Sequence, residues 1–344
     1  MDYKQAGVDV EAGNEVVRRI RSLARGTFTP GVLSDIGSFG GLFRLESAGV
    51  ADPVLVASAD GVGTKLRVAF MTGVHRTIGV DLVNHCVNDI LVQGAQPLFF
   101  LDYLATGRLD PAVAVQVVEG LAAACRGNGC ALLGGETAEM PGFYADGEYD
   151  LAGFIVGVVA RDRVINGRRI VPGDVLIGLP SSGLHTNGYS LARQVLFDVA
   201  GLSIDARVPA LGGTVGEALL APHRSYLSVL RPLLGSDSIK GMAHITGGGL
   251  TDNLPRMFPE GTSPLVDLRT WTPAPLFTFL AEAGSVPEAD MLRTFNMGIG
   301  LVIACAKEHE ARVLGALAQA GEPGAVAIGS AVPGDGRIVY TGTR

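Results

Sequence analysis

Apolar positions recur along the chain in two patterns, one typical of amphipathic helices and one of buried strands. Apolar residues at spacings of three and four predict helices, over 11–25, 77–93, 189–199 and 311–320. Short apolar runs that end in glycine or turn residues predict strands, over 53–60, 98–103, 130–133, 151–160, 175–179, 244–246 and 295–306. Pro111 behind the N-cap residue Asp110 predicts one further helix, and another is expected near 252–257. The chain is therefore of mixed α and β class, with no repeat of solenoid period.

The segment 165–174 (INGRRIVPGD) separates two halves that use the same order of strand, glycine loop and helix. A chain of 344 residues is long enough for two domains at about 150 residues each. We therefore expect an N-terminal domain over 1–166 and a C-terminal domain over 167–344.

Composition narrows the class of protein further. Lys and Arg number 27 against 34 Asp and Glu, a net charge of −7, which argues against a nucleic-acid partner. No apolar run approaches the ~18 residues of a spanning helix, and the N-terminus has no apolar signal core, so we expect a cytosolic protein without a membrane partner. The four cysteines form no C-x-x-C pair, which favours buried free thiols.

The predicted helix over 77–93 carries an unusual polar face. Asp81, Asn84, His85, Asn88 and Asp89 fall within an arc of about 140° at 100° per residue. These short side chains can bind a cation or a phosphate, whereas a water-facing helix ordinarily uses Lys and Glu. From the helix alone, a ligand site and a solvated face are about equally plausible.

A glycine loop follows the predicted strand 53–60 and reads Asp60-Gly-Val-Gly-Thr-Lys65. Backbone N–H groups in such a loop can hold phosphate oxygens, Lys65 can neutralise them, and Asp60 can hold Mg²⁺. The spacing is neither that of a P-loop nor that of the dinucleotide fingerprint. Taken alone, an Asp-Gly turn is more often only a turn.

The segment 134–137 (Gly-Gly-Glu-Thr) also places glycines and a carboxylate where a predicted strand is expected to end. Asp60, Asp89 and Glu136 then come from three different elements. Mg²⁺ favours a few carboxylates together with substrate phosphates, so these features together indicate an ATP–Mg²⁺ site. Three unrelated surface carboxylates are the alternative.

Two glycine loops in the second half offer candidates for a second phosphate. One is 183–188, which includes His185 and Asn187, and the other is 246–249, where Thr246 precedes three glycines. Both precede predicted helices, whose N-termini attract anions. For either loop alone, a tight turn between strand and helix is the simpler interpretation. His75, His223 and His309 have no evident partners in the sequence.

Together these motifs resemble the phosphoribosylformylglycinamidine cyclo-ligases, or AIR synthetases, over nearly the whole chain. The matching blocks occur in order, namely YKQAGVDVEAGN, SADGVGTKL, GVDLVNHCVNDILVQGAQPLFFLDYLATG, GGETAEMPG, SSGLHTNGYSL, HITGGGLTDNLPR and RTFNMGIG. The resemblance implies a two-domain α+β protein whose N-terminal sheet forms a barrel with that of a second subunit, giving a homodimer.

The resemblance also implies a reaction and its cofactors. In this family, formylglycinamidine ribonucleotide and ATP give aminoimidazole ribonucleotide, ADP and phosphate, with Mg²⁺, in purine biosynthesis. The formyl oxygen is phosphorylated, an amidine nitrogen attacks the formyl carbon, and phosphate leaves as the ring closes. Such chemistry needs positioning and charge neutralisation more than a protein nucleophile.

Mapped onto this chain, the resemblance implies roles for named residues. The expected metal ligands are Asp60, Asp89 and Glu136. The expected ATP contacts are Asp60, Gly61, Gly63, Thr64, Lys65, Asn88, Gly134, Gly135, Glu136 and Thr137. The expected substrate contacts are His185, Asn187, Thr246, Gly247, Gly248 and Gly249. The residues expected to act in catalysis are Lys65, Asp89 and His185, the last either as a base or by orienting the substrate.

Other members of the same ATP-binding superfamily are the nearest alternatives. Selenophosphate synthetases use a Cys or selenocysteine near the N-terminus, whereas the first cysteine here is Cys86. Thiamine-monophosphate kinases lack SADGVGTKL and RTFNMGIG, and the synthetase of the preceding purine step is longer in many versions. A non-catalytic nucleotide-binding protein is the alternative from another class, against which the intact Asp60, Lys65, Asp89 and Glu136 argue.

Overall fold

The computed structural model describes residues 10–36 and 40–343, so the start of the first matching sequence block lies outside the described residues. The chain forms two compact units, one of residues 1–91 and 95–162 and the other of residues 92–94 and 163–344. The division predicted after residue 166 lies a few residues beyond this boundary.

The first unit is built on a four-stranded sheet in the order β1-β4-β2-β3. Its strands are β1 (Pro53–Gly61), β2 (Gln96–Thr106), β3 (Ala131–Glu139) and β4 (Tyr149–Ala160). β2 and β3 are parallel, and β4 runs antiparallel to both β1 and β2. β1 and β3 are therefore the two edge strands, on opposite sides of the sheet.

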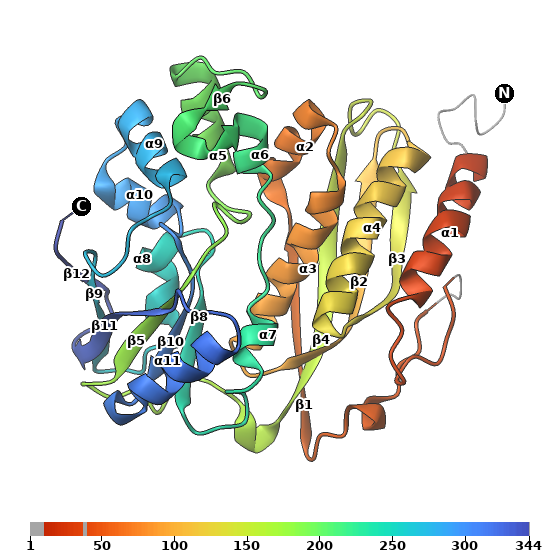
Figure 1. Ribbon diagram of the computed structural model, residues 1–344. Coiled ribbons are helices and arrows are strands. Elements are labelled where there is room, and N and C mark those ends of the chain that lie inside the picture. The colour runs from red at the N-terminus through yellow and green to blue at the C-terminus, as the bar shows by residue number, and fades with distance from the viewer. Residues whose placement is uncertain (1–9, 37–39, 344) are drawn as a thin grey trace. The chain divides into compact units, whose positions relative to one another are not determined.

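Helices α3 (Arg76–Leu91) and α4 (Pro111–Asn128) cover one face of this sheet (Figure 1). They cross closely because a Cβ on Gly79 would overlap the Val117 carbonyl, and one on Gly120 would overlap the Arg76 carbonyl. Asp110 caps α4 by accepting a hydrogen bond from the Ala112 N–H, as predicted.

Two further helices complete this unit. Helix α1 (Val10–Arg25) packs against α4 and β3, and the short α2 (Leu66–Thr72) follows the glycine loop. The sheet face that α3 and α4 do not cover carries apolar side chains open to solvent in the single chain. Leu55 on β1 is 56% exposed and Phe154 on β4 is 46% exposed.

The second unit has a six-stranded sheet in the order β12-β9-β11-β5-β10-β8 and a small β6-β7 ribbon. Its strands are β5 (Val175–Pro180), β6 (Arg207–Val208), β7 (Gly213–Thr214), β8 (Ile239–His244), β9 (Thr262–Asp267), β10 (Ile299–Cys305), β11 (Val326–Pro333) and β12 (Val339–Thr341). Its helices are α5 (Tyr189–Arg193), α6 (Val215–Leu219), α7 (Leu227–Leu230), α8 (Gly249–Asn253), α9 (Pro275–Gly284), α10 (Glu288–Thr294) and α11 (Glu310–Gln319). β10, which lies between β5 and β8, is buried along its whole length.

Three sequence predictions about local structure need correction. The strand expected over 244–246 is β8, which ends at His244. The strand expected to end at the 134–135 glycines continues through Glu139, so Glu136 lies within β3 and not at its end. The helix expected over 189–199 is α5 followed by one π-helical segment, Gln194–Val199. The four cysteines are free and buried, as predicted.

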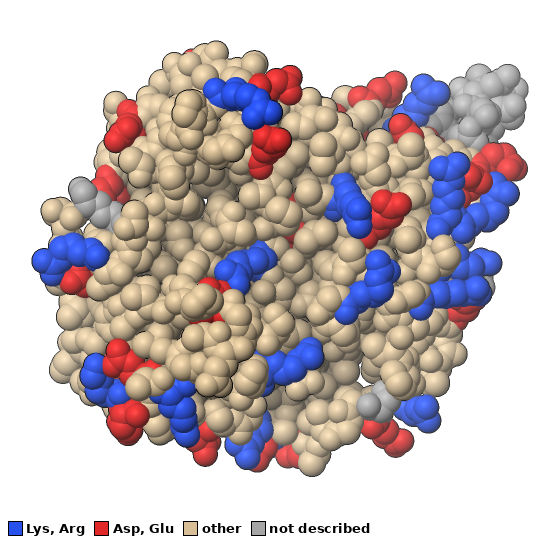
Figure 2. All heavy atoms as spheres, in the orientation of Figure 1, with Lys and Arg blue, Asp and Glu red and all other residues tan. Residues whose placement is uncertain are grey.

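Charge and hydropathy of the described residues add two observations. Basic and acidic side chains are interspersed on the face shown in Figure 2, with no single basic field over it. No helix among the described residues combines the length and the apolar character that crossing a membrane requires.

Candidate active site

The polar face of α3 is buried inside the first unit, which argues against the solvated interpretation. Asp81 and Lys65 are both fully buried and form an ion pair with 2.8 Å between Nζ and Oδ2. Asn84 accepts a hydrogen bond of 2.9 Å from the Asn128 amide, and Asn88 is buried. Each buried polar group costs free energy unless it is paired. A helix that buries polar residues on one side as well as apolar residues on the other is therefore typical of a functional site.

Asp60, His85 and Asp89 form an acidic cluster at the β1 edge of the sheet. The His85 Nε2 atom lies 2.7 Å from Asp60 Oδ2 and 3.7 Å from Asp89 Oδ2. The Ser58 hydroxyl donates a 3.2 Å hydrogen bond to Asp89. The structure thus brings Asp60 and Asp89, two of the three predicted metal ligands, around the Nε2 atom of His85. Sequence reasoning placed His85 on the same helix face as Asp89 but gave it no role.

The charges in this cluster stabilise one another. Burial alone would lower the pKa of His85, but the hydrogen bond with Asp60 and the charges of Asp89 and Asp60 outweigh it and raise that pKa. Burial likewise opposes ionisation of Asp60, yet the hydrogen bond from His85 leaves its pKa below the ordinary value. Asp60 therefore stays ionised, and the Asp89 carboxylate approaches the same imidazole nitrogen. Carboxylate oxygens are the donors that Mg²⁺ prefers, so this pair fits such an ion.

Lys65 lies inside the first unit, and its predicted contact with ATP phosphates stays a prediction. Its ammonium group is fully buried against Asp81, and burial lowers its pKa although Asp81 opposes this effect. A direct contact with ATP phosphates would require this pair to break. In this conformation Lys65 anchors the glycine loop to α3, while Gly61, Gly63 and Thr64 remain the parts of the loop that can meet a ligand.

The sheet also separates Glu136 from the acidic cluster. Asp60 lies opposite Gly153, which lies opposite Asp102, which lies opposite Gly135. Three strand spacings of about 4.8 Å place β1 and β3 about 14 Å apart, beyond the combined reach of an Asp and a Glu toward one ion. This separation argues against a metal ion shared by Asp60 and Glu136 of one subunit, and the set of three ligands stays a prediction.

Gly134, Gly135, Glu136 and Thr137 instead line a separate pocket of about 540 Å³ at the β3 edge. Helix α1 forms its opposite wall. The predicted ATP contacts thus fall into two groups at opposite edges of one sheet, and the spacing of the sequence motifs could not reveal this.

In the second unit, the two predicted glycine loops lie close together around the start of β10. A Cβ on Gly188 would overlap the Phe295 ring, and one on Gly249 would overlap the Leu292 carbonyl. Asn296 links these loops because it accepts from the Ser181 hydroxyl at 2.9 Å and donates to the Gly183 carbonyl at 2.8 Å. The RTFNMGIG motif therefore acts as a brace, a role that sequence reasoning did not assign.

The loop 246–249 is held by one buried side chain. The Asn253 amide donates to the carbonyls of Gly247 and Gly249 at 3.0 and 2.9 Å. The Asn187 side chain lies directly beside Gly247, where a Cβ would come within 3.2 Å of its Oδ1 atom. Two predicted substrate contacts thus meet, but the helix behind the loop, α8, has only five residues and contributes less dipole than expected.

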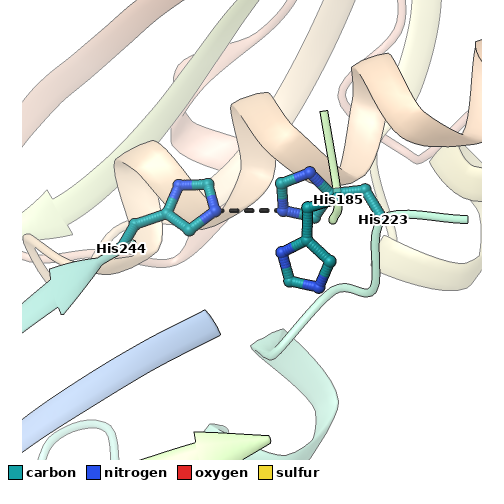
Figure 3. Close-up of side chains that lie close together, drawn as sticks. All are labelled: His185, His223 and His244. Carbon is teal, nitrogen blue, oxygen red and sulfur yellow. Dashed lines mark hydrogen bonds between the residues drawn. The ribbon is translucent and has the colours of Figure 1, made fainter. Parts of the chain in front are cut away.

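His185, His223 and His244 form a buried stack of imidazoles (Figure 3). The rings of His185 and His223 are nearly parallel, with centroids 3.9 Å apart, and His223 Nε2 lies 3.0 Å from His244 Nε2. Two parallel rings cannot both direct an in-plane lone pair at one ion, so this arrangement is a hydrogen-bonded stack rather than a metal centre. The sequence interpretation that His223 has no partners was wrong, because His244 is distant in sequence and adjacent in the fold.

His185 itself has an unusual backbone. Its φ is +60°, in the left-handed region that non-glycine residues rarely adopt. The Ser182 N–H donates to its Nε2 at 3.1 Å, and the absence of a side chain at Gly300 leaves room for its ring. Such strain is typical of functional loops.

The fold and these loops define a class, that of the AIR synthase-related proteins. The family described as AIR synthase related protein, N-terminal domain, matches residues 45–159, and its C-terminal domain counterpart matches residues 171–341. Among solved structures, thiamine-monophosphate kinase from Stenotrophomonas maltophilia aligns with a TM-score of 0.70 at 19% identity, over 95% of this chain and 96% of that one. A hydrogenase maturation protein HypE in complex with ATP aligns with a TM-score of 0.64 at 20% identity, over 94% and 90%. At this identity both show the fold alone.

Closer relatives identify the family within this class. The phosphoribosylformylglycinamidine cyclo-ligase of Trichlorobacter lovleyi is 56% identical over 93% of this chain and 92% of its own length. That of Geobacillus thermodenitrificans is 52% identical over 99% and 98%. This chain belongs to the phosphoribosylformylglycinamidine cyclo-ligase family, as the sequence motifs predicted.

Proposed function

We propose that this protein closes the imidazole ring of aminoimidazole ribonucleotide from formylglycinamidine ribonucleotide, with conversion of ATP to ADP and phosphate. The observation that carries the proposal is the paired carboxylate cluster of Asp60 and Asp89, together with full-length similarity to cyclo-ligases. This carboxylate cluster suits a phosphoryl-transfer enzyme, which needs charged groups in fixed positions and no protein nucleophile.

In the proposed reaction the formyl oxygen attacks the γ-phosphorus of ATP and ADP leaves. The ring-forming nitrogen then attacks the formyl carbon. Phosphate departs with the former formyl oxygen, and the nitrogen gives up its proton. Mg²⁺, when bound, would neutralise phosphate charge during transfer. Asp60 and Asp89 are the residues that would hold it, and the loop containing Gly61, Gly63 and Thr64 would bind the phosphates.

The second unit supplies the proposed substrate contacts. The backbone N–H groups of 247–249, fixed by Asn253, suit the 5′-phosphate of the ribonucleotide. His185 and Asn187 are proposed to face the amidine. Because the His185 Nε2 accepts the Ser182 N–H, we assign this ring to orienting the substrate rather than to removing its proton.

We further propose that the active form is a homodimer. Leu55 and Phe154 lie on a sheet face that no helix of the described chain covers, and apolar faces of this kind mark interfaces. A second copy also resolves the division of the ATP contacts. Asp60 and Glu136 of one subunit are too far apart to hold one metal ion, whereas Glu136 of a second copy would complete the site.

An isotope experiment tests the chemistry directly. Substrate carrying ¹⁸O in its formyl group is incubated with the protein, ATP and Mg²⁺, and the products are analysed by mass spectrometry. The proposal predicts one ¹⁸O atom in each phosphate released and none in aminoimidazole ribonucleotide. Phosphate without the label, or ring closure without ADP, would overturn it.

A further inference from the structure

His223 is the member of the imidazole stack that contacts both of the others (Figure 3). It lies in the segment between α6 and α7. One of its neighbours, His185, belongs to the loop 183–188, and the other, His244, ends β8 just before the loop 246–249. The His223 side chain is fully buried, so its two ring nitrogens need partners inside the protein.

Both ring nitrogens of His223 meet polar atoms. Nδ1 lies 3.3 Å from Thr186 Oγ1, and Nε2 lies 3.0 Å from His244 Nε2. Two facing imidazole nitrogens need one proton between them, because two lone pairs or two N–H groups would repel each other. The proton positions of His223 and His244 are therefore linked.

The Asn187 side chain favours one direction for this chain of hydrogen bonds. Its amide N–H group donates to Thr186 Oγ1 at 3.5 Å, so the hydroxyl proton of Thr186 is directed toward His223 Nδ1. A neutral His223 that accepts at Nδ1 carries its proton on Nε2 and donates to His244 Nε2. His244 then carries its own proton on Nδ1.

The stack gives His223 a second contact with the loop 183–188. The rings of His185 and His223 are 20° from parallel, with centroids 3.9 Å apart. His185 has a φ of +60°, and such a strained backbone persists only where surrounding contacts hold it. His223 supplies two of these contacts, to His185 through its ring face and to Thr186 through its ring edge.

We propose that His223 is a positioning residue for ring closure, which sets the spacing between the amidine end and the phosphate end of the substrate site. The proposal rests on the function proposed above, in which His185 and Asn187 face the amidine and the loop 246–249 binds the 5′-phosphate. One ribonucleotide must reach both loops, and a positioning error of about 1 Å can cost about a hundredfold in rate. His223 holds the loops in place through its contacts with Thr186 and His244.

Two variants separate the hydrogen bonds of His223 from its packing. His223→Phe keeps a ring that can stack on His185 but loses both hydrogen bonds. His223→Gln loses the ring, but its amide lies about where Nε2 was and can keep the bond to His244.

Steady-state kinetics of ring closure measures the two variants. The kcat of His223→Phe should fall about tenfold, as expected for the loss of one buried hydrogen bond, and that of His223→Gln should stay within about threefold of wild type. The KM for ATP should be unchanged in both, because the proposed ATP contacts lie in the first unit. His309→Phe, the same change at a half-buried histidine at the start of α11, is the matched control and should behave like wild type.

A measurement on the wild-type protein needs no variant to fold. NMR of the full chain with ¹⁵N-labelled histidine reports which ring nitrogen carries the proton. The expected spectrum has His223 protonated on Nε2 and His244 protonated on Nδ1.

Two results would overturn the inference. One is a kcat of folded His223→Phe equal to or above that of His223→Gln, since ring packing alone would then explain the role of His223. The other is a wild-type spectrum in which His244 carries its proton on Nε2. The NMR measurement tests the hydrogen-bond chain without turnover, whereas absence of product from the wild-type protein would refute the proposed reaction.

Discussion

The two edges of the first sheet treat carboxylates in opposite ways. At the β1 edge, the hydrogen bond with His85 holds the pKa of Asp60 below its ordinary value, and Asp89 approaches the same imidazole. At the β3 edge, no cation among residues 10–36 and 40–343 pairs with Asp102, and burial raises its pKa to about 7. The same residue type is thus ionised at one edge and holds its proton up to about pH 7 at the other. The charge of a site depends on its pairing and not on its residue composition.

The largest expected effect comes from breaking the ionised edge. Asp89→Asn removes one charge and one metal-binding oxygen, so turnover should fall about a hundredfold or more. The fold should persist, because Asn can still accept the Ser58 hydrogen bond. ADP release measured beside thermal unfolding checks both statements, with Asp146→Asn as the control. Near-normal turnover would remove Asp89 from the metal site.

The buried pair beneath this edge is the next target. Lys65→Met leaves Asp81 charged, buried and unpaired, so the free energy of unfolding should fall by about 3–5 kcal/mol. Combining it with Asp81→Leu should recover most of this loss. Urea denaturation measures both.

ATP affinity of the double variant separates the two roles considered for Lys65. An anchoring Lys65 predicts nearly unchanged ATP affinity in a stable double variant. A large loss of ATP affinity at restored stability would favour the direct phosphate contact predicted from the sequence.

A third variant tests the close packing of α3 against α4, the two helices that cover the sheet. Gly120→Ala places a methyl group against the Arg76 carbonyl at the crossing of α3 and α4, and should cost about 3 kcal/mol of unfolding free energy. Gly127→Ala lies in the same helix with open space around it, and should stabilise the protein by about 0.5–1 kcal/mol. Equal effects of the two variants on the chemical denaturation midpoint would contradict the close crossing.

The smallest effect concerns the neutral edge. Folded Asp102 holds its proton up to about pH 7, whereas the unfolded chain releases it near pH 4, so stability falls as pH rises between these values. This loss of stability should be absent in Asp102→Asn. Denaturation of both proteins at pH 4, 5.5 and 7 measures the difference between them. Parallel pH curves would show that Asp102 ionises normally.

Local patterns predicted most of the helices and strands of the first unit. The helix over 77–93 is α3, and the polar arc that suggested a site is the face that binds Lys65, Asn128 and Asp60. In the second unit, α9, α10 and β9 were missed, since their short apolar runs carry neither clear periodicity nor a following glycine loop.

Tertiary adjacency was beyond the reach of sequence spacing. Three carboxylates on three strand or helix ends looked like one metal site, but the strand order β1-β4-β2-β3 places Glu136 at the far edge. His223 showed no local signal, because its partners His185 and His244 approach from other loops. Asp102 lay unnoticed in an apolar strand, where a single carboxylate between Phe100 and Leu104 was the available signal.

The measurement that tests the central claim most directly is ADP release by the purified protein with ATP and Mg²⁺, with and without formylglycinamidine ribonucleotide. The account predicts ADP only when this substrate is present, with one ADP for each aminoimidazole ribonucleotide formed. A folded, ATP-binding protein that releases no ADP with this substrate, or that releases ADP equally without it, would contradict the account.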